Sequence, residues 1–397
     1  MSHPSIRPLS VAGAILGAAL LASCATPPLV ASPGSPSAGA GETPARPLVL
    51  EHIPDDPILH GEAIAASAVV ALPGGGFLLF KQADVVRGGA LLRSMDGQAW
   101  QPVDAAASGL DVGTIVAIAA TSSTVMVLAT LQPPVENEAG TPERAEWTSA
   151  DGSTWARVAQ PTFRAFGIRD IVGSATGFAA LGDAPRTVLI SGLDGRDWLA
   201  TELPAGASEH GSVDDVTAAG DGFVAVGTVE GRPAGWRWAG TGWLPVSLPA
   251  TGDFSRIAVS QGRIVVTGST EVADPGDPSR TQLTSVAWES DDLGATWTKV
   301  GLQVAGGTEL RVFALAGGFL GVLTPSPADA SAMLTAWRST RAGAWDPIAI
   351  GDAGTGWDLP FVSSLAVSGQ RVVLAGNTVG TGAGGDRVVV WVADLAP

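Results

Sequence analysis

Four charged residues occupy equivalent positions in successive units of a sequence repeat. They are two acids, Asp170 and Asp215, followed by two arginines, Arg256 and Arg311. Ser364 takes the same position in the next unit, and the flanking charged residues are Arg169, Asp214 and Glu309. Side chains that converge from several units could form a polar pocket for a sugar or a carboxylated ligand. They could also pair with one another and only satisfy partly buried charge. An inverting glycosidase needs two carboxylates about 6.5–9.5 Å apart, a spacing that Asp170 and Asp215 could meet.

Other residues that could bind a metal or act in catalysis lack the spacing that such a site requires. His52, His60 and His210 are scattered, so a zinc site or a Ser-His-Asp triad has no support. Asp274 and Asp277 share one segment but lack the full ligand spacing of a calcium loop, so a plain loop is favoured. No G-x-x-x-x-G-K-[ST] phosphate loop is present. We therefore predict no metal, no cofactor and no catalytic residue.

Cys24 is the single cysteine, and the segment before it indicates its chemistry. The apolar run VAGAILGAALLA, 12 residues long, is too short to span a bilayer but suits the core of a signal peptide. It leads into Leu-Ala-Ser-Cys, which resembles a bacterial lipobox, where the cysteine is diacylated and the chain is cut just before it. We expect a signal peptide over 1–23 and a disordered tether over 24–47 that is rich in Pro, Ser, Gly and Ala. The remaining chain would be held outside the cytoplasm, on the bacterial cell membrane, by acyl chains.

Composition excludes one class of partner. The net charge is −16, and Lys and Arg are nowhere clustered. A nucleic acid needs clustered cations to displace its counterions, so we predict no nucleic-acid binding. Hydrophobic residues make up 46% of the chain and charged residues 15%, which is ample apolar material for a core.

Seven units share one order of signals from about residue 63 to the end of the chain. Each has two apolar strands joined by a tight turn, a variable loop, a third strand, and in most units a D-G-x-x-W-like turn that opens a fourth strand. The turns close on Trp100, Trp155, Trp198, Trp243, Trp297 and Trp345, which lie 55, 43, 45, 54 and 48 residues apart. Four short strands per unit at this period are typical of a β-propeller blade. We therefore predict an all-β, seven-bladed propeller of four-stranded antiparallel blades over 48–397.

The seventh unit reaches its third strand at Trp391 and then ends. A strand-like segment at about 48–53 belongs to no other unit. If it supplies the missing fourth strand, the two ends of the chain close the ring and remove an exposed sheet edge. We predict that 48–53 runs antiparallel to 387–394.

The Trp-bearing turns carry a family resemblance. The segment SDDLGATW, which ends at Trp297, matches the S-x-D-x-G-x-T-W Asp box, and the copy that ends at Trp155 is one residue shorter. The chain thus resembles the Asp-box (BNR-type) repeats of sialidase-like propellers, xyloglucan-cleaving glycosidases, photosystem assembly factors and sortilin-type receptors. The resemblance implies structural roles at the rim, away from the binding face, for Asp96, Asp151, Asp194 and Asp292 and for Trp100, Trp155, Trp198 and Trp297.

The sialidase activity of that family is not expected here. Retaining sialidases use a tyrosine nucleophile, and this chain has no tyrosine and no F-R-I-P segment. We predict a non-catalytic binding or scaffolding propeller, monomeric, for an unknown protein or glycan. The alternative is a glycan-processing hydrolase with a carboxylate pair at the channel mouth. The candidate ligand-binding residues are Arg169, Asp170, Asp214, Asp215, Arg256 and Arg311, with Trp357 as a possible platform for a sugar ring.

Overall fold

The computed structural model describes part of the chain. The described residues are 48–53, 57–60, 65–82, 89–104, 107, 110, 113–131, 143–158, 168–182, 184, 186–204, 210–274, 277–302, 307–325, 334–351, 359–379 and 387–395. All of them belong to one compact unit, Arg46–Pro397. Cys24, the predicted signal peptide and the predicted tether lie outside the described residues, as does Trp357.

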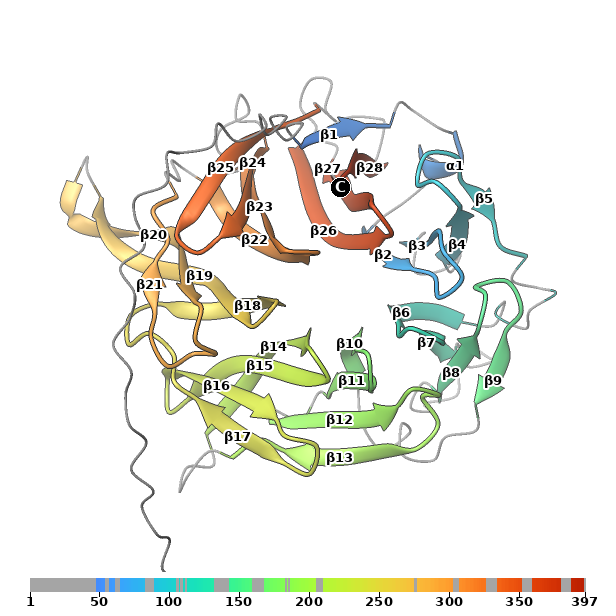
Figure 1. Cartoon of the computed structure of the whole chain (residues 1–397), viewed down its shortest axis with the longest axis horizontal. Coiled ribbons are helices and arrows are strands. Elements are labelled where there is room, and N and C mark those ends of the chain that lie inside the picture. Colours follow the sequence, from blue (N-terminus) through green and yellow to red (C-terminus); the bar gives the residue numbers. More distant parts are fainter. Residues whose placement is uncertain are drawn as a thin grey trace, which may run out of the picture. The chain divides into compact units, whose positions relative to one another are not determined.

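The described chain is almost entirely β-strand and forms a β-propeller, as predicted (Figure 1). Five blades are separate four-stranded antiparallel sheets. Blade 1 contains β2 (Ala65–Ala71), β3 (Phe77–Gln82), β4 (Gly89–Ser94) and β5 (Gln101–Pro102). Blade 2 contains β6 (Gly113–Ala120), β7 (Val125–Leu131), β8 (Glu143–Ser149) and β9 (Ala156–Val158). Blade 3 contains β10 (Ile168–Gly173), β11 (Gly177–Gly182), β12 (Thr187–Gly192) and β13 (Trp198–Glu202).

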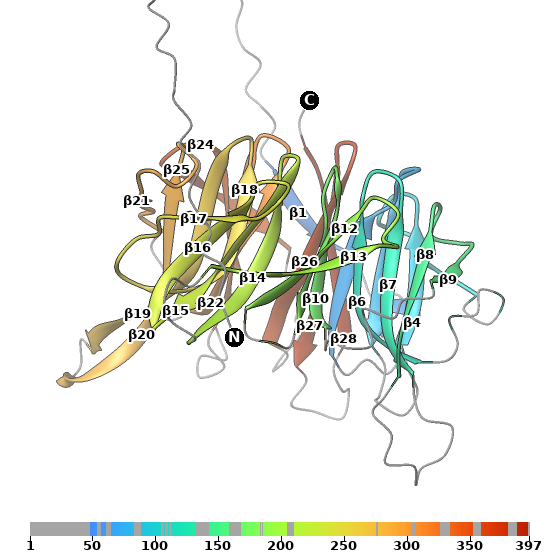
Figure 2. The same ribbon diagram turned by 90° about the horizontal axis from the view of Figure 1, so that it is seen from below.

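The next two blades repeat this order. Blade 4 contains β14 (Gly211–Ala219), β15 (Gly222–Val229), β16 (Arg232–Trp238) and β17 (Trp243–Val246). Blade 5 contains β18 (Asp253–Ser260), β19 (Arg263–Asp274), β20 (Asp277–Ser290) and β21 (Thr298–Lys299). Strands β19 and β20 are longer than the others, and their hairpin projects beyond the neighbouring blades (Figure 2). Asp274 and Asp277 pair across its tip, so the segment predicted to be a plain loop is mostly strand.

The last two blades are joined by the N-terminal strand β1 (Val49–His52) into an eight-stranded sheet. Blade 6 contains β22 (Gly307–Leu315), β23 (Gly318–Pro325), β24 (Thr335–Arg341) and β25 (Ala344–Ile350). Blade 7 contains β26 (Leu359–Ser368), β27 (Arg371–Val379) and β28 (Arg387–Asp394). The one helix in the described part, α1 (Pro57–His60), was not predicted, and its Leu59 is buried.

Strand β1 closes the ring. It pairs antiparallel with β28, with Glu51 opposite Val392 and His52 opposite Trp391, so the predicted closure is confirmed. It also pairs in parallel with β25 of blade 6, a contact that the repeat pattern did not indicate. The indole N–H of Trp391 donates to the carbonyl of Gly351, 2.7 Å away, on the chain that leaves β25. The segment therefore ties both neighbouring blades together.

The hydrophobic core lies between blades rather than on the propeller axis. Seven clusters of buried side chains each combine residues from two adjacent blades, including the pair formed by blades 7 and 1. The tryptophan of each unit packs against the preceding blade; Trp155, for example, lies with residues of blades 1 and 2. The inner strands β2, β6, β10, β14, β18, β22 and β26 surround the centre, so their polar side chains are free to line it (Figure 1).

Candidate ligand site in the propeller channel

One position on each inner strand is equivalent in all seven blades. Strand register identifies it, because the residue lies three pairs before the last pair of the first hairpin in blades 1–3 and four pairs before it in blades 4–7. From blade 1 to blade 7 these residues are Ala68, Ala117, Asp170, Asp215, Arg256, Arg311 and Ser364. In every blade a β-bulge lies close before the position, and a bulge re-aims the side chains beside it. At this position blades 3–7 carry polar side chains, whereas blades 1 and 2 carry Ala68 and Ala117.

A cavity of about 440 Å³ opens at this ring of positions. Six of the predicted ligand residues line it: Arg169, Asp170, Asp214, Asp215, Arg256 and Arg311. Aliphatic residues line it as well, among them Ile171, Val216 and Ile257. The volume lies within the roughly 300–1,000 Å³ range of small-ligand sites.

Glu309 holds the two arginines of blades 5 and 6. Its carboxylate accepts from Arg311 Nε at 3.0 Å and lies 3.4 Å from Nη2 of Arg256. Arg311 also donates from Nη1 to the carbonyl of Ser363, 3.1 Å away, and stacks over Phe361 at 4.6 Å from the ring centroid. Arg311 is therefore fixed in place by blade 7 as well as by its own strand. The repeat alignment had treated Glu309 only as a flanking charge.

The carboxylates of blades 3 and 4 have no such partner. Asp170 Oδ1 accepts the backbone N–H of Ile171 at 2.7 Å. Asp215 accepts the N–H of Val216 at 2.9 Å and, across the blade interface, the N–H of Ile257 at 2.8 Å. Within the described part of the chain, neither forms an ion pair within 4.0 Å. The arginines therefore do not clamp these acids.

Electrostatics at the two acids follow from this geometry. Desolvation raises the pKa of Asp215 to about 7, and the nearby charge of Asp170 adds to the rise. The hydrogen bond from the Ile257 N–H and the charge of Arg256 lower this pKa in part. Desolvation also raises the pKa of Asp170, although its side chain stays open to the channel, because protein surrounds it on several sides. The positive charges of Arg256, Arg169 and Arg311 only partly oppose that rise. Asp215 therefore gains or loses its proton close to neutral pH, unlike an ordinary carboxyl group.

The remaining polar residues of the ring connect blades. Arg169 donates from Nη2 to the carbonyl of Val213 in blade 4, 2.6 Å away. Desolvation raises the pKa of Asp214, whose carboxylate accepts from Ser212 Oγ at 3.2 Å. Ser364 bonds both the N–H and the carbonyl of Val69, at 3.0 and 3.1 Å, and so links blade 7 to blade 1. Ser364 is therefore occupied by the backbone.

The Asp-box acids lie in the outer turns and bond their own backbone. Asp151 Oδ1 accepts the N–H groups of Ser153 and Thr154 at 2.7 and 2.8 Å, which lowers its pKa. Asp96 and Asp292 accept N–H groups in the same way, and Asp194 accepts that of Arg196 at 3.2 Å. Gly152 adopts a φ of 73°, and a Cβ there would meet Leu72 of blade 1 at 2.6 Å. None of these four acids lines the channel cavity.

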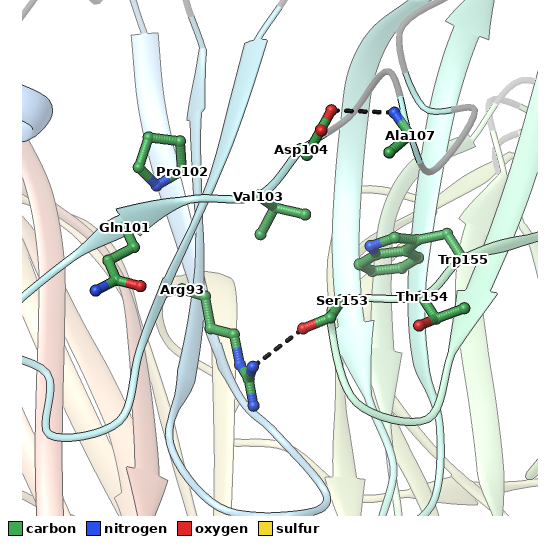
Figure 3. A pocket seen from close by; sticks show the side chains of 9 residues that line it. All are labelled: Arg93, Gln101, Pro102, Val103, Asp104, Ala107, Ser153, Thr154 and Trp155. Atoms are coloured by element: carbon green, nitrogen blue, oxygen red, sulfur yellow. Dashed lines mark hydrogen bonds between the residues drawn. The ribbon is translucent and has the colours of Figure 1, made fainter.

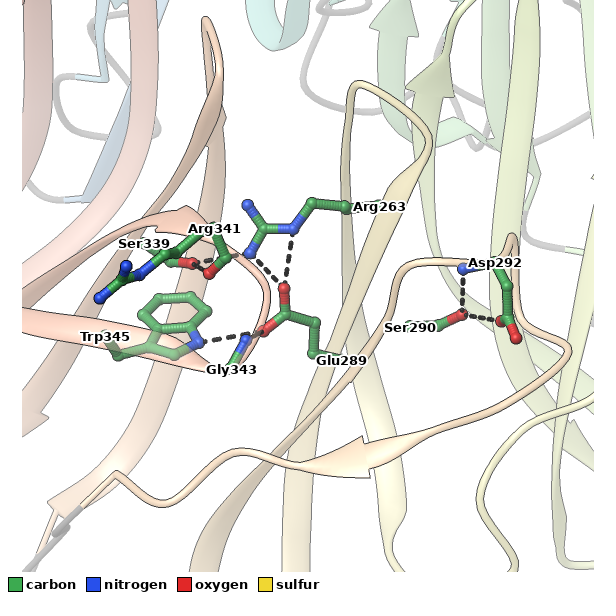
Figure 4. A network of polar contacts seen from close by, with 8 residues as sticks. All are labelled: Arg263, Glu289, Ser290, Asp292, Ser339, Arg341, Gly343 and Trp345. Carbon is green, nitrogen blue, oxygen red and sulfur yellow. Dashed lines mark hydrogen bonds and ion pairs between the residues drawn. The ribbon is translucent and has the colours of Figure 1, made fainter. Parts of the chain in front are cut away.

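The Trp-bearing turn of blade 6 contains no Asp and is bonded instead by a carboxylate from blade 5 (Figure 4). Glu289 Oε2 accepts the N–H of Gly343 at 3.1 Å and the indole N–H of Trp345 at 3.3 Å. Its other oxygen forms a buried ion pair with Arg263, which in turn donates to Ser339 Oγ at 2.7 Å. Sequence reasoning missed this network, because Glu289 and the turn it supports are 54 residues apart.

A second cavity, of about 430 Å³, lies between blades 1 and 2 beside the Asp-box turn of blade 2 (Figure 3). Arg93 reaches across it and donates to Ser153 Oγ at 3.0 Å, and Trp155 forms part of its wall. Asp104, on the opposite side, accepts the N–H of Ala107. Arg93 and Asp104, the two charged residues of its lining, are thus each bonded to the protein.

Among the described residues no group of three or more His, Cys, Asp or Glu side chains could hold a metal ion. No helix in the described part has the length and apolar character needed to cross a membrane.

Comparisons with known proteins identify the fold. No family model and no curated protein match the sequence. YCF48 from Cyanidioschyzon merolae has a similar structure, with TM-score 0.52 and 13% identity over 87% of this chain and 98% of that one. The GH74 xyloglucanase from Xanthomonas campestris gives TM-score 0.53 and 14% identity over 86% of this chain. The match spans 55% of that enzyme. The WD40 domain of Pan2 from Neurospora crassa gives TM-score 0.50 and 9% identity over 88% of this chain and 95% of that one. At such identities the likeness shows a β-propeller and leaves the activity open.

Proposed function

We propose that this chain is a binding or scaffolding propeller that holds a small polar ligand in its channel. The observation that carries the proposal is the 440 Å³ cavity on the inner strands, which Asp170 lines with a carboxylate oxygen that accepts no hydrogen bond from the described residues. Catalysis is not required to explain the polar ring, because much of its hydrogen bonding links one blade to the next. A protein partner would present its binding groups at the same opening.

The binding test uses the purified full chain and calorimetric titration with glycans and peptidoglycan fragments. Asp170→Asn keeps the acceptor for the Ile171 N–H but removes the charge, so we expect affinity to fall about tenfold or more. Asp221→Asn, at an exposed turn outside the cavity, is the matched control and should bind like the wild type. Equal affinity in Asp170→Asn and wild type would refute a channel site.

A second candidate, a glycan hydrolase, is favoured by one observation. Asp215 has a pKa of about 7 and sits beside a second carboxylate, and a carboxyl group that stays protonated near neutral pH can serve as a general acid. The structural likeness to a xyloglucanase makes xyloglucan the first substrate to assay. Release of reducing sugar that is lost in Asp215→Asn would support hydrolysis. Ligand binding without any bond cleavage would exclude hydrolysis and support binding as the function.

Location is a separate proposal, which rests on the sequence. We infer that Cys24 carries acyl chains and holds the propeller at the outer face of a bacterial membrane. The support is the lipobox-like Leu-Ala-Ser-Cys after a short apolar run.

A further inference from the structure

The positive charges around the channel are already used by the protein. Both ends of the Arg311 guanidinium are bonded, to Glu309 and to the Ser363 carbonyl. Arg169 donates to two backbone carbonyls, those of Gly182 and Val213. Arg256 donates to the Ser255 carbonyl and pairs with Glu309. An anionic ligand would therefore compete with protein acceptors that these guanidinium groups already have.

The negative charges on the opposite side are not compensated in the same way. Asp170 and Asp215 use three carboxylate oxygens to accept backbone N–H groups, and the fourth, Asp170 Oδ2, has no hydrogen bond within the described chain. Neither acid has an ion-pair partner there. Desolvation raises the pKa of each acid, and the charges of the nearby arginines only partly oppose it, while the Asp170 side chain stays open to the channel. A cation placed beside Asp170 would relieve this desolvation cost directly.

The shape of the cavity limits what that cation can be. Its volume of about 440 Å³ suits a short organic molecule or one side chain. Ile171, Val216 and Ile257 also line the cavity, so its lining includes aliphatic residues that suit methylene groups. A metal ion fits poorly, because the described residues offer no group of three ligating side chains.

From these observations, and resting on the proposed function, we infer that the channel ligand presents an ammonium or guanidinium group on a short alkyl stem to Asp170 and Asp215. A free amine and the side chain of a lysine or arginine on a partner share this chemistry. The overall charge of −16 would favour the approach of either.

The test is calorimetric titration of the full chain with probes of different charge. Putrescine represents a free amine, and a blocked tripeptide with a central lysine represents a partner side chain. Acetate and glucose are the anionic and neutral probes. We expect the lysine peptide, putrescine or both to bind, and acetate and glucose to bind at least about tenfold more weakly. Whichever cationic probe binds more tightly identifies the source of the ligand.

Two variants separate a cation site from an anion site. Asp170→Asn should weaken cation binding about tenfold or more, because it removes the free carboxylate. Arg256→Gln should strengthen it, because it removes a like charge from the cavity wall. Weaker cation binding in Arg256→Gln would overturn the inference. Asp221→Asn should have no effect, and thermal melting of each variant checks that it folds.

The pH dependence gives an independent readout. The charged groups that face the two acids are Arg169 from β10, Arg256 from β18 and Arg311 from β22, and Asp214 lies beside Asp215 on β14. A cation binds the ionised pair, so its affinity should rise as the pH increases from 6 to 8, with release of protons. If glucose or acetate binds in a manner sensitive to Asp170→Asn and the cations do not, the cation inference fails and the channel site stands. If no probe and no glycan binds, the proposed function itself fails.

Discussion

The buried ion pair between blades 5 and 6 allows a quantitative test of how the ring is held together. Glu289 accepts from Arg263 in its own blade and from Gly343 and Trp345 in the next. The side chains of Glu289 and Arg263 are only 4% and 14% exposed. Glu289→Ala would leave a buried guanidinium without its counter-charge and two N–H groups without an acceptor.

The expected cost follows from these losses. Removing one partner of a buried ion pair destabilises a protein by about 3–5 kcal/mol. The unfolding entropy of the 46–397 unit is about 0.7 kcal/mol/K, from roughly 2.1 cal/mol/K per residue. We therefore expect Glu289→Ala to lower the melting temperature by about 4–7 °C.

The assay is thermal and urea unfolding of a double-mutant cycle. Arg263→Leu and Glu289→Leu each leave the other charge buried and unpaired, whereas the double variant leaves none. The double variant should therefore be less destabilised than the sum of the singles, by about 0.5–3 kcal/mol. A melting temperature of Glu289→Ala within 1 °C of wild type, or strictly additive singles, would show that the network does not stabilise the interface.

Three further predictions concern other parts of the molecule. Burial raises the pKa of Glu146 to about 8; a hydrogen bond with Trp198 lowers this pKa in part, and the charge of Asp194 raises it further. The folded state therefore holds a proton that the unfolded state releases above about pH 4.5. Stability should fall as the pH rises from 6 to 8, by up to about 1.4 kcal/mol per pH unit from this group, and urea unfolding of Glu146→Gln should show a flatter dependence. Leu50→Ala, in the fully buried part of the closing strand, should cost about 2–5 kcal/mol in urea unfolding, against a change within about 0.5 kcal/mol for the exposed Val49→Ala. Metabolic labelling with palmitate should mark the wild-type chain and not Cys24→Ser; an unlabelled wild type, or equal labelling of both, would exclude acylation at Cys24.

The repeat was readable from the sequence because each blade is a local structure. A tight hairpin, a third strand and a Trp-bearing turn all form within about 50 residues, so their signals recur at a regular interval. The same alignment identified Asp170, Asp215, Arg256 and Arg311 as equivalent. The ring closure was also accessible, because the seventh unit lacked one strand and 48–53 was the one unassigned candidate.

The contacts between blades were not readable in the same way. The parallel pairing of β1 with β25, the reach of Glu289 into the turn of blade 6 and the bond from Asp215 to the Ile257 N–H all join residues at least 42 positions apart. No periodic signal marks such pairs. The repeat pattern contains no side-chain distances. It therefore could not show that Arg256 and Arg311 form their ion pairs with Glu309 and not with Asp170 or Asp215.

The amino-acid order by itself determined the blade, its number of copies and the strand that closes the ring, because hydrogen bonding within a blade is local and repetitive. Only the tertiary structure decided which charges in the channel are neutralised. Glu309 lies close enough to both arginines to pair with them, which leaves Asp170 and Asp215 without an ion-pair partner among the described residues, and proximity across blades is set by the packing of whole sheets.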